Sequence, residues 1–312
     1  MRAMIVGAGL GTRLRPLTNL CPKPAVPVRG IPLVAYQLAL LARHGVREVV
    51  INTHHLPELL IEAARRFCPP RLELRFSHEK ELLDTGGGIR RVAGFLRESD
   101  PCLLVGADML LDADLGRLVR LHRERGDAWT MLLRDDPRAA RFGSLGIDES
   151  GRVRRIGSRF ALPGETRAGV YVWTNVVSPR AFDHMPDREA FSHFDEWIGP
   201  WLAAGAEDVR GELWGPAQCT WEPVGTLREY LAANLAPPRL GYLDADALAR
   251  ARGVRFGPEC VIGAGASIGA GASLRGVVVW DGERVPAGLR AEEGVFAGGA
   301  FHRCGEPDGG GA

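Results

Sequence analysis

Glycines and cations gather in one short segment near the start of the chain. The segment, GAGLGTRLRPLTNLCPKP, runs from Gly7 to Pro24 and carries Arg13, Arg15 and Lys23. Glycines let backbone N–H groups approach phosphate oxygens without an intervening Cβ atom. Lys23 stands between two prolines, which restrict the backbone on both sides of it and so would help to aim its ammonium group. The segment therefore predicts a loop that binds a polyphosphate.

The glycine loop differs from two common phosphate-binding patterns. GAGLGT is not a complete G-x-G-x-x-G, so the indication of a dinucleotide fold is weak, and the G-K-S/T of a P-loop is missing. The cations behind the glycines are what set this loop apart.

Strand-like and helix-like segments alternate ahead of and behind this loop. Short apolar runs predict buried strands, and amphipathic segments with glycine or proline at their ends predict helices. We expect strands at 3–6, 47–55, 71–79, 101–109 and 128–135, and helices at 32–46, 56–67, 85–96 and 115–126. Short units of this kind imply parallel strands joined by crossover helices, hence an open α/β sheet.

Three polar or glycine-rich features follow the ends of these strands. They are the Gly7–Lys23 loop, the segment Thr85–Gly88, and Asp108 at the end of the run PCLLVGAD. Ligands of open α/β sheets bind beyond the carboxyl ends of the strands. The sequence therefore predicts one ligand site built from all three features.

The C-terminal region has a different pattern. Val261, Ser267 and Ser273 lie six residues apart, as do Ile262, Ile268 and Leu274 at the ends of similar steps. A six-residue period is typical of a β-helix with an aliphatic residue pointing inward from each short strand. The segment LAPPRLG at 235–241 reads as a linker, so we expect one domain over 1–237 and a short left-handed β-helix with its tail over 238–312.

Composition excludes several classes of protein. The chain has 312 residues, 46% of them hydrophobic and 25% charged, with a net charge of +1, so no overall field favours nucleic acid or a membrane surface. The six cysteines are scattered without metal-ligand spacing. No run approaches the roughly 20 apolar residues of a membrane span, and the opening apolar run is too short for a signal peptide. We expect a cytoplasmic protein.

Taken together, GLGTRLRPLT and PKPAVPV resemble the motif of the sugar-1-phosphate nucleotidylyltransferases, the NDP-sugar pyrophosphorylases. LLDTGGGI and VGADML are similar to later motifs of the same family, and the resemblance covers about residues 1–235. Six-residue repeats also occur in this family, notably in mannose-1-phosphate guanylyltransferases. The resemblance implies a Rossmann-like nucleotidyltransferase domain with a mixed, mostly parallel sheet.

The resemblance implies that an NTP and a sugar 1-phosphate give an NDP-sugar and pyrophosphate. The nucleophile is a phosphate oxygen that is already anionic, so positioning, fixed cations and Mg²⁺ suffice without a general base. Arg13 and Lys23 would be catalytic, Asp108 would bind Mg²⁺, and Gly143 would lie near the sugar. The nucleotide-binding residues would be Gly7, Ala8, Gly9, Gly11, Thr12, Thr85 and Gly86.

The chain departs from the family pattern where a second metal-binding aspartate is usual. The W-x-D-V-G-T segment reads WEPVGT, so Pro223 stands at the aspartate position. Glu222 is the substitute metal ligand that we consider, although neighbouring residues of a strand face opposite sides unless the strand bulges.

A second departure concerns the sugar site. Ser158 and Arg159 replace part of a V-E-K-P run, and Arg167 replaces a common asparagine. Either Arg159 and Arg167 hold the sugar phosphate in a rebuilt site, or the chain is a nucleotide-sugar-binding regulatory subunit without turnover. The muramate-1-phosphate uridylyltransferases also lack that run.

The sequence leaves base and sugar open. GTP with mannose 1-phosphate is the leading expectation, from the repeats alone, and UTP with a muramate-type sugar 1-phosphate is the next. We expect no nucleic-acid or membrane partner, and homo-oligomer contacts through the C-terminal repeats.

Overall fold

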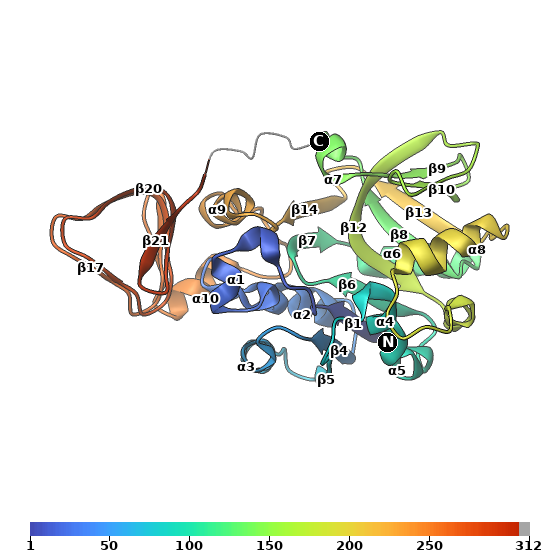
Figure 1. The fold of residues 1–312 in the computed structure, drawn as a ribbon, viewed down its shortest axis with the longest axis horizontal. Coiled ribbons are helices and arrows are strands. Elements are labelled where there is room, and N and C mark those ends of the chain that lie inside the picture. The colour runs from blue at the N-terminus through green and yellow to red at the C-terminus, as the bar shows by residue number, and fades with distance from the viewer. Residues whose placement is uncertain (306–312) are drawn as a thin grey trace.

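The computed structural model describes residues 1–305 and places the chain in two adjoining regions (Figure 1). A large sheet flanked by helices forms one region, and the C-terminal strands stack at its far end beside α9 and α10 (Figure 1). The end of the expected second domain, 306–312, lies outside the described residues.

The central sheet is mixed. Its strand order is β11-β10-β9-β12-β6-β1-β4-β5, and β8 joins β12 to β13. β1 pairs in parallel with β4 and β6, and β4 pairs in parallel with β5. The strands are β1 (Arg2–Val6), β4 (Glu48–Thr53), β5 (Glu73–His78), β6 (Cys102–Gly106), β8 (Trp129–Arg134), β9 (Leu145–Ile147), β10 (Val153–Ile156), β11 (Phe160–Ala161), β12 (Arg167–Val177) and β13 (Val209–Trp214).

One long antiparallel strand interrupts the expected parallel order. β12 runs antiparallel to β6 on one side and to β8 on the other. The strand expected at 128–135 therefore exists as β8 but does not neighbour β6. An α/β fold with a mixed, largely parallel sheet is confirmed, and the simple alternation of strand and crossover helix ends at β6.

Helices cover both faces of this sheet, and the strands alternate between two apolar cores. Ala3 and Ile5 of β1 belong to one buried cluster, whereas Met4 belongs to the other, because successive strand side chains point to opposite faces. The helices are α1 (Leu17–Leu20), α2 (Leu33–Arg43), α3 (Pro57–Arg66), α4 (Asp84–Arg91), α5 (Ala93–Arg97), α6 (Leu115–Arg125), α7 (Ala139–Phe142), α8 (Gly199–Ala203), α9 (Leu227–Leu235) and α10 (Ala245–Ala251).

Short helical turns and a two-stranded sheet complete the region around the site. The helix expected at 85–96 divides into α4 and α5 at Val92, whose φ of −110° and ψ of 9° leave the helical region. β7 (Met109–Ala113) pairs antiparallel with β14 (Cys219–Pro223). The remaining turns and strands are 3₁₀ turns at Thr12–Leu14, Lys23–Ala25 and Pro179–His184, a π-helix at His193–Ile198, and the pair β2 (Pro27–Val28) and β3 (Ile31–Pro32).

The C-terminal strands form stacked coils. Cys260 pairs in parallel with Val277 and Val277 with Gly294, so each coil takes seventeen residues, close to three six-residue steps. This arrangement is consistent with a β-helix. The strands are β15 (Arg255–Phe256), β16 (Cys260–Ile262), β17 (Ser267–Ile268), β18 (Ser273–Val279), β19 (Arg284–Val285), β20 (Arg290–Ala297) and β21 (Ala300–Arg303).

The inward orientation expected of the six-spaced aliphatic residues is only partly correct. Ile262 and Leu274 pack against the interior of the coils. Ile268 is instead 37% exposed, because β17 pairs with β19 alone and has no coil on its other side.

Arg29 fastens the coil region to the central region. Its guanidinium donates two hydrogen bonds to the Asp246 carboxylate, at 2.8 and 2.6 Å, and lies 3.7 Å from the ring centre of Phe256. Val278 and Val295 of the coils share a buried cluster with Tyr36 and Tyr230. The domain boundary between residues 237 and 238 remains a prediction. Residues from both sides of this boundary belong to one apolar cluster.

A search of the described helices finds none whose length and hydropathy would suit it to crossing a bilayer.

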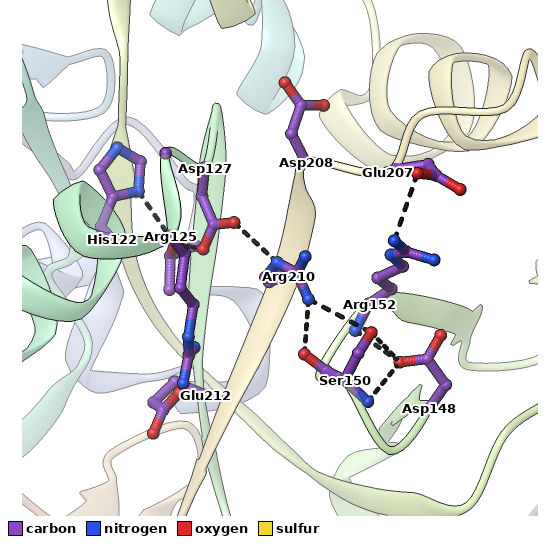
Figure 2. Close-up of polar contacts among 12 residues, drawn as sticks. His122, Arg125, Asp127, Asp148, Ser150, Arg152, Glu207, Asp208, Arg210 and Glu212 are labelled. Carbon is purple, nitrogen blue, oxygen red and sulfur yellow. Dashed lines mark hydrogen bonds and ion pairs between the residues drawn. The ribbon is translucent and has the colours of Figure 1, made fainter.

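A polar network joins the turn before β10 to the starts of β8 and β13, which pair in parallel. Figure 2 shows Arg210 of β13 between Asp127 and Ser150. The Arg210 Nε atom lies 2.7 Å from Asp127 Oδ1, and the Asp127 side chain is only 1% exposed. Burial raises the pKa of Asp127, and hydrogen bonds from Thr130 and Arg210 oppose that rise. Arg210 therefore compensates a carboxylate that water cannot reach.

Replacing Arg210 should cost far more stability than replacing a neighbouring arginine whose partner is solvated. Arg210→Met should lower the free energy of unfolding at pH 7 by about 3–5 kcal/mol, since it leaves a buried charge unpaired. Arg152→Met is the control and should cost less than about 1 kcal/mol, because its partner Glu207 is 71% exposed. Urea unfolding measures both losses. The Arg210→Met loss should shrink at lower pH, where protonated Asp127 needs no cation; equal losses for the two variants would contradict this account.

Candidate active site

Two adjoining cavities open beyond the carboxyl ends of β1 and β6. The first cavity has a volume of about 520 Å³ and is bordered by the glycine loop. The second cavity, of about 760 Å³, lies between β12, β14 and the segment that begins the π-helix. The residues that border both cavities are Arg13, Asp84, Thr85, Asp108, Trp173 and Gly225.

The glycine loop forms one wall of the first cavity. The loop residues that border it are Gly7, Ala8, Gly9, Gly11, Thr12 and Arg13. A Cβ atom on Gly9 would meet nothing within 4 Å, so the loop is open to a ligand at this position. Gly11 has a φ of +62°, and a Cβ atom there would lie 2.9 Å from Thr18 Cγ2. Glycine at position 11 is therefore required by both backbone conformation and space.

Two buried polar side chains hold the start of the loop. Asn52 Oδ1 accepts a hydrogen bond from the Gly7 N–H at 2.7 Å, and Asn52 Nδ2 donates to Glu79 Oε1 at 2.7 Å. Glu79 Oε2 accepts from the Leu83 N–H at 3.2 Å. The network ties the glycine loop to the segment that leads into α4. Sequence reasoning missed Asn52 and Glu79, although both are polar residues at or near the ends of predicted strands.

Lys23 and Asp108 meet where the two cavities join. Lys23 Nζ lies 2.8 Å from Asp108 Oδ2, and the two side chains are 12% and 44% exposed. Burial by itself would raise the pKa of Asp108, but the nearby charges of Lys23 and Arg13 outweigh burial and lower it. The carboxylate therefore stays ionised beside the first cavity, as a ligand for a hard cation requires.

The TGGG segment has a different role from the one expected for its first glycine. Thr85 borders both cavities. The Gly86 N–H donates instead to the Phe191 carbonyl at 2.9 Å, and a Cβ atom on Gly86 would lie 2.3 Å from the Phe191 ring. The Gly86 N–H is therefore occupied by Phe191, and a nucleotide contact by the rest of the Gly86 backbone stays a prediction.

The second cavity contains part of the predicted sugar site. Gly143, with a φ of +76°, and Arg159 both border it. Arg159 Nη1 lies 2.8 Å from Asp195 Oδ2, and Arg141 Nη2 lies 2.7 Å from Glu229 Oε1. Arg141 and Glu229 also border this cavity, and sequence reasoning missed both.

Arg167 and Glu222 are not among the residues that border the two cavities. Arg167, near the start of β12, donates to the backbone carbonyl of Glu149 at 3.3 Å. Glu222 Oε2 lies 2.8 Å from Arg138 Nη1, while its neighbour Pro223 borders the second cavity. β14 does not bulge here, so Glu222 faces the opposite side of the strand from Pro223. These positions do not support the expected sugar-phosphate role of Arg167 or the expected metal role of Glu222, and both roles stay predictions.

The donor set around Asp108 fits a magnesium ion that is shared with a substrate. In the described part of the chain, 1–305, no three His, Cys, Asp or Glu side chains gather as a closed metal site. Mg²⁺ commonly takes one or two carboxylates and completes its shell with substrate phosphates and water. Asp108 offers one such carboxylate, and Asp84 borders both cavities as well.

The chain matches the nucleotidyl transferase family over residues 2–238. It is 33% identical to a mannose-1-phosphate guanylyltransferase of Mycobacterium tuberculosis, over 93% of this chain and 82% of that protein. It is 28% identical to a UTP–glucose-1-phosphate uridylyltransferase of Synechocystis, over 61% of this chain and 52% of that protein. A mannose-1-phosphate guanylyltransferase catalytic subunit beta of Xenopus tropicalis is also 28% identical, over 74% of this chain and 63% of that protein.

Solved structures agree with this relationship at the level of the fold. The structure of HddC from Yersinia pseudotuberculosis complexed with GMP-PN is similar with a TM-score of 0.59 at 21% identity, over 74% of this chain and 97% of that one. The family and the fold both agree with the phosphate-binding chemistry that the glycine loop, its cations and Asp108 suggest. The chain belongs to the nucleotidyl transferase family and is a sugar-1-phosphate nucleotidylyltransferase.

Proposed function

We propose that this enzyme transfers a guanylyl group from GTP to mannose 1-phosphate, giving GDP-mannose and pyrophosphate. The observation that carries the proposal is the meeting of two cavities at Arg13 and Asp108. The Mycobacterium tuberculosis guanylyltransferase supports the choice of substrates, because its similarity covers 93% of this chain. Because the nucleotidyl transferase region ends at residue 238, a similarity over 93% of the chain must extend into the C-terminal coils.

The reaction needs placement and charge compensation more than proton transfer. An anionic oxygen of the sugar phosphate attacks the α-phosphorus of the NTP, and the bond from that phosphorus to the bridging oxygen of the β-phosphate breaks. Pyrophosphate leaves with the electron pair, so the protein need not supply a general base. The two reactants repel each other, and fixed cations in a cleft reduce that repulsion.

The residues around the first cavity suit this task. Lys23 and Arg13 would neutralise the triphosphate, and the open backbone at Gly9 would approach it without a Cβ atom. Asp108 would hold Mg²⁺, which when bound supplies further positive charge to the phosphates. The nucleotide would occupy the first cavity and the sugar phosphate the second, with Arg13 between them.

A second substrate pair is favoured by one feature of the second cavity. Ser158 and Arg159 border it where the family commonly has a V-E-K-P run, and the muramate-type uridylyltransferases share that departure. UTP with a muramate-type sugar 1-phosphate is therefore the alternative. We also propose that the C-terminal coils form a short left-handed β-helix and that homo-oligomer contacts run through them.

Pyrophosphate release from a panel of NTPs and sugar 1-phosphates tests the proposal. GTP with mannose 1-phosphate should give a kcat/KM at least tenfold above any other pair. A higher value for UTP with a muramate-type sugar would establish the alternative. Release from no pair, with tight binding of an NDP-sugar, would identify a regulatory protein instead.

Arg13 should matter far more than its close neighbour Arg15. Arg13 borders both cavities, whereas Arg15 borders neither. Arg13→Met should lower kcat by about 10²–10³-fold, the usual cost of losing one placed transition-state charge, with a smaller change in KM for the NTP. Arg15→Met is the matched control and should retain near-normal kcat. Steady-state kinetics measures both; equal effects would refute the role of Arg13.

Asp108 and Glu222 should differ sharply as metal ligands. Asp108→Asn should raise the Mg²⁺ concentration for half-maximal nucleotide binding at least tenfold, because it removes the carboxylate beside the first cavity. Glu222→Gln should leave that concentration unchanged, since Glu222 faces Arg138. Titration of a fluorescent nucleotide against Mg²⁺ gives the comparison without turnover. A shift caused by Glu222→Gln would restore Glu222 as a ligand.

A further inference from the structure

The side chain of Arg141, in α7, borders the second cavity and is open to solvent. Its Nη2 atom lies 2.7 Å from Glu229 Oε1, and the side chain is 55% exposed. Within residues 1–305, the structure gives this guanidinium no other hydrogen bond. The Nε and Nη1 atoms of Arg141 are therefore available to a ligand that enters the cavity.

Two anchors fix α7 beside this cavity. Arg138, which precedes the helix, has its Nη1 atom 2.8 Å from Glu222 Oε2. Phe142, at the end of the helix, packs edge-on against Trp221, with ring centres 5.1 Å apart. Both partners belong to β14. The backbone that carries Arg141 is thus fastened at both ends, and its side chain starts from a defined point.

Glu229 holds one edge of the Arg141 guanidinium and has partners of its own. Its Oε2 atom accepts hydrogen bonds from the Gly225 N–H at 2.7 Å and the Thr226 N–H at 3.0 Å. These bonds belong to the capping box that begins α9, where backbone donors stabilise a carboxylate. The Glu229 side chain is only 11% exposed. Its carboxylate therefore stays compensated while Arg141 shares its remaining donors with a ligand.

Glu229 also places Arg141 close to the junction of the two cavities. Gly225 borders both cavities. A Cβ atom on Gly225 would lie 3.0 Å from Glu229 Oε2 and 3.6 Å from Arg13 Nη2. Arg13 and the Arg141–Glu229 pair therefore flank one point, and that point is where two substrates held in the two cavities would meet.

The third arginine that borders the second cavity is placed differently. Arg159 pairs with Asp195, and both residues also border a further groove of about 320 Å³ beside Phe160 and Pro200. Neither Arg13 nor Arg141 borders that groove. Arg159 thus belongs to the part of the second cavity next to the groove, and Arg141 belongs to the part near Arg13.

We propose that Arg141 binds the phosphate of the sugar 1-phosphate, and that Glu229 is a positioning residue which holds the guanidinium toward the cavity. In-line attack on the α-phosphorus requires the two phosphates to meet, so the attacking phosphate belongs near Arg13. An arginine with an open edge binds two phosphate oxygens at once. The inference rests on the proposed function and names the group in the second cavity that receives the attacking phosphate.

Steady-state kinetics at saturating NTP tests the role of Arg141. Arg141→Met should raise KM for mannose 1-phosphate about 10- to 100-fold, since a charge-assisted contact is lost. KM for the NTP should stay unchanged, and kcat should fall less than KM rises, because the contact is made before the transition state as well as in it. Arg141→Lys keeps the charge and should recover part of the loss.

The same variant separates a phosphate contact from a sugar contact. Every sugar 1-phosphate that the enzyme accepts should show the same rise in KM, because the phosphate is the group they share. A rise that differs from sugar to sugar would overturn the proposal. If Arg141→Met does not fold, Arg141→Gln takes its place with the same expected rise, and an unchanged KM there would overturn the proposal as well.

Two other arginines complete the comparison. Arg125 forms a similar pair with Glu212, at 2.6 Å and with side chains 34% and 15% exposed, and it borders neither cavity. Arg125→Met is the matched control and should leave both KM values unchanged; a rise equal to that of Arg141→Met would refute a specific role. A larger rise for Arg159→Met than for Arg141→Met would assign the phosphate to Arg159 instead.

A double-mutant cycle tests the positioning role of Glu229. Glu229→Gln should raise KM for mannose 1-phosphate in the wild-type background by a smaller factor than Arg141→Met does. In the Arg141→Met background the same change should add nothing, because the side chain that Glu229 holds is gone. Additive effects of the two substitutions would show that Glu229 acts independently of Arg141.

Binding of the product separates failure of this inference from failure of the proposed function. The β-phosphate of GDP-mannose comes from the sugar 1-phosphate, and GMP lacks it. By calorimetry, Arg141→Met should bind GDP-mannose at least tenfold more weakly than wild type and GMP equally well. Equal affinity of both proteins for GDP-mannose, with an active wild type, would overturn the role of Arg141 alone. No pyrophosphate release by wild type from any substrate pair would overturn the proposed function itself.

Discussion

The ion pair between Lys23 and Asp108 is the contact around which the rest of the site is arranged. Their charged atoms lie 2.8 Å apart at the junction of the two cavities. In the free protein each charge neutralises the other, so neither stands unpaired in a narrow cleft. In the proposed reaction, the triphosphate would take the place of Asp108 beside Lys23, and a divalent cation would take the place of Lys23 beside Asp108. The fold must therefore hold one loop and one strand end at this separation.

Hydrogen bonds from neighbouring strands keep the loop in place. Asn52, in β4, accepts a hydrogen bond from the Gly7 N–H and donates one to the Glu79 carboxylate. Glu79 in turn accepts a hydrogen bond from the Leu83 N–H, just before α4. A Cβ atom on Gly88 would come within 2.8 Å of the Glu79 carboxylate. The glycines of α4 thus allow the helix to lie against this network and against Phe191. These glycines therefore contribute to the site by letting α4 pack closely against the residues that hold the loop.

The second cavity depends on a strand that runs against the direction of its neighbours. β12 pairs with β6 and β8 in antiparallel fashion and carries its irregular turn to the border of the cavities. Trp173 in this irregular stretch borders both cavities, while the coil region lies at the far end of the molecule (Figure 1). The coils are fixed there by the Arg29–Asp246 pair and by an apolar cluster shared with α9.

The sequence by itself determined the fold class, most strand and helix positions of the first 135 residues, and the glycine loop, Lys23, Thr85 and Asp108 at the first cavity. Those features follow from local patterns: apolar periodicity, a glycine turn behind a strand, and prolines around Lys23. Asp108 was identifiable because it closes an apolar strand. The alternation of residues along a strand already argued against Glu222 as a metal ligand. In the structure the Glu222 carboxylate points toward Arg138, with which it forms an ion pair.

Tertiary structure alone decided which groups are available to a ligand. The Gly86 N–H is occupied by Phe191, which is more than one hundred residues away in the chain. Arg167 donates a hydrogen bond to the backbone carbonyl of Glu149 and does not border the second cavity. Trp173 and His193 pack together although they lie twenty residues apart in the chain. Such long-range pairings leave no local periodicity, so no pattern in the amino-acid sequence could reveal them.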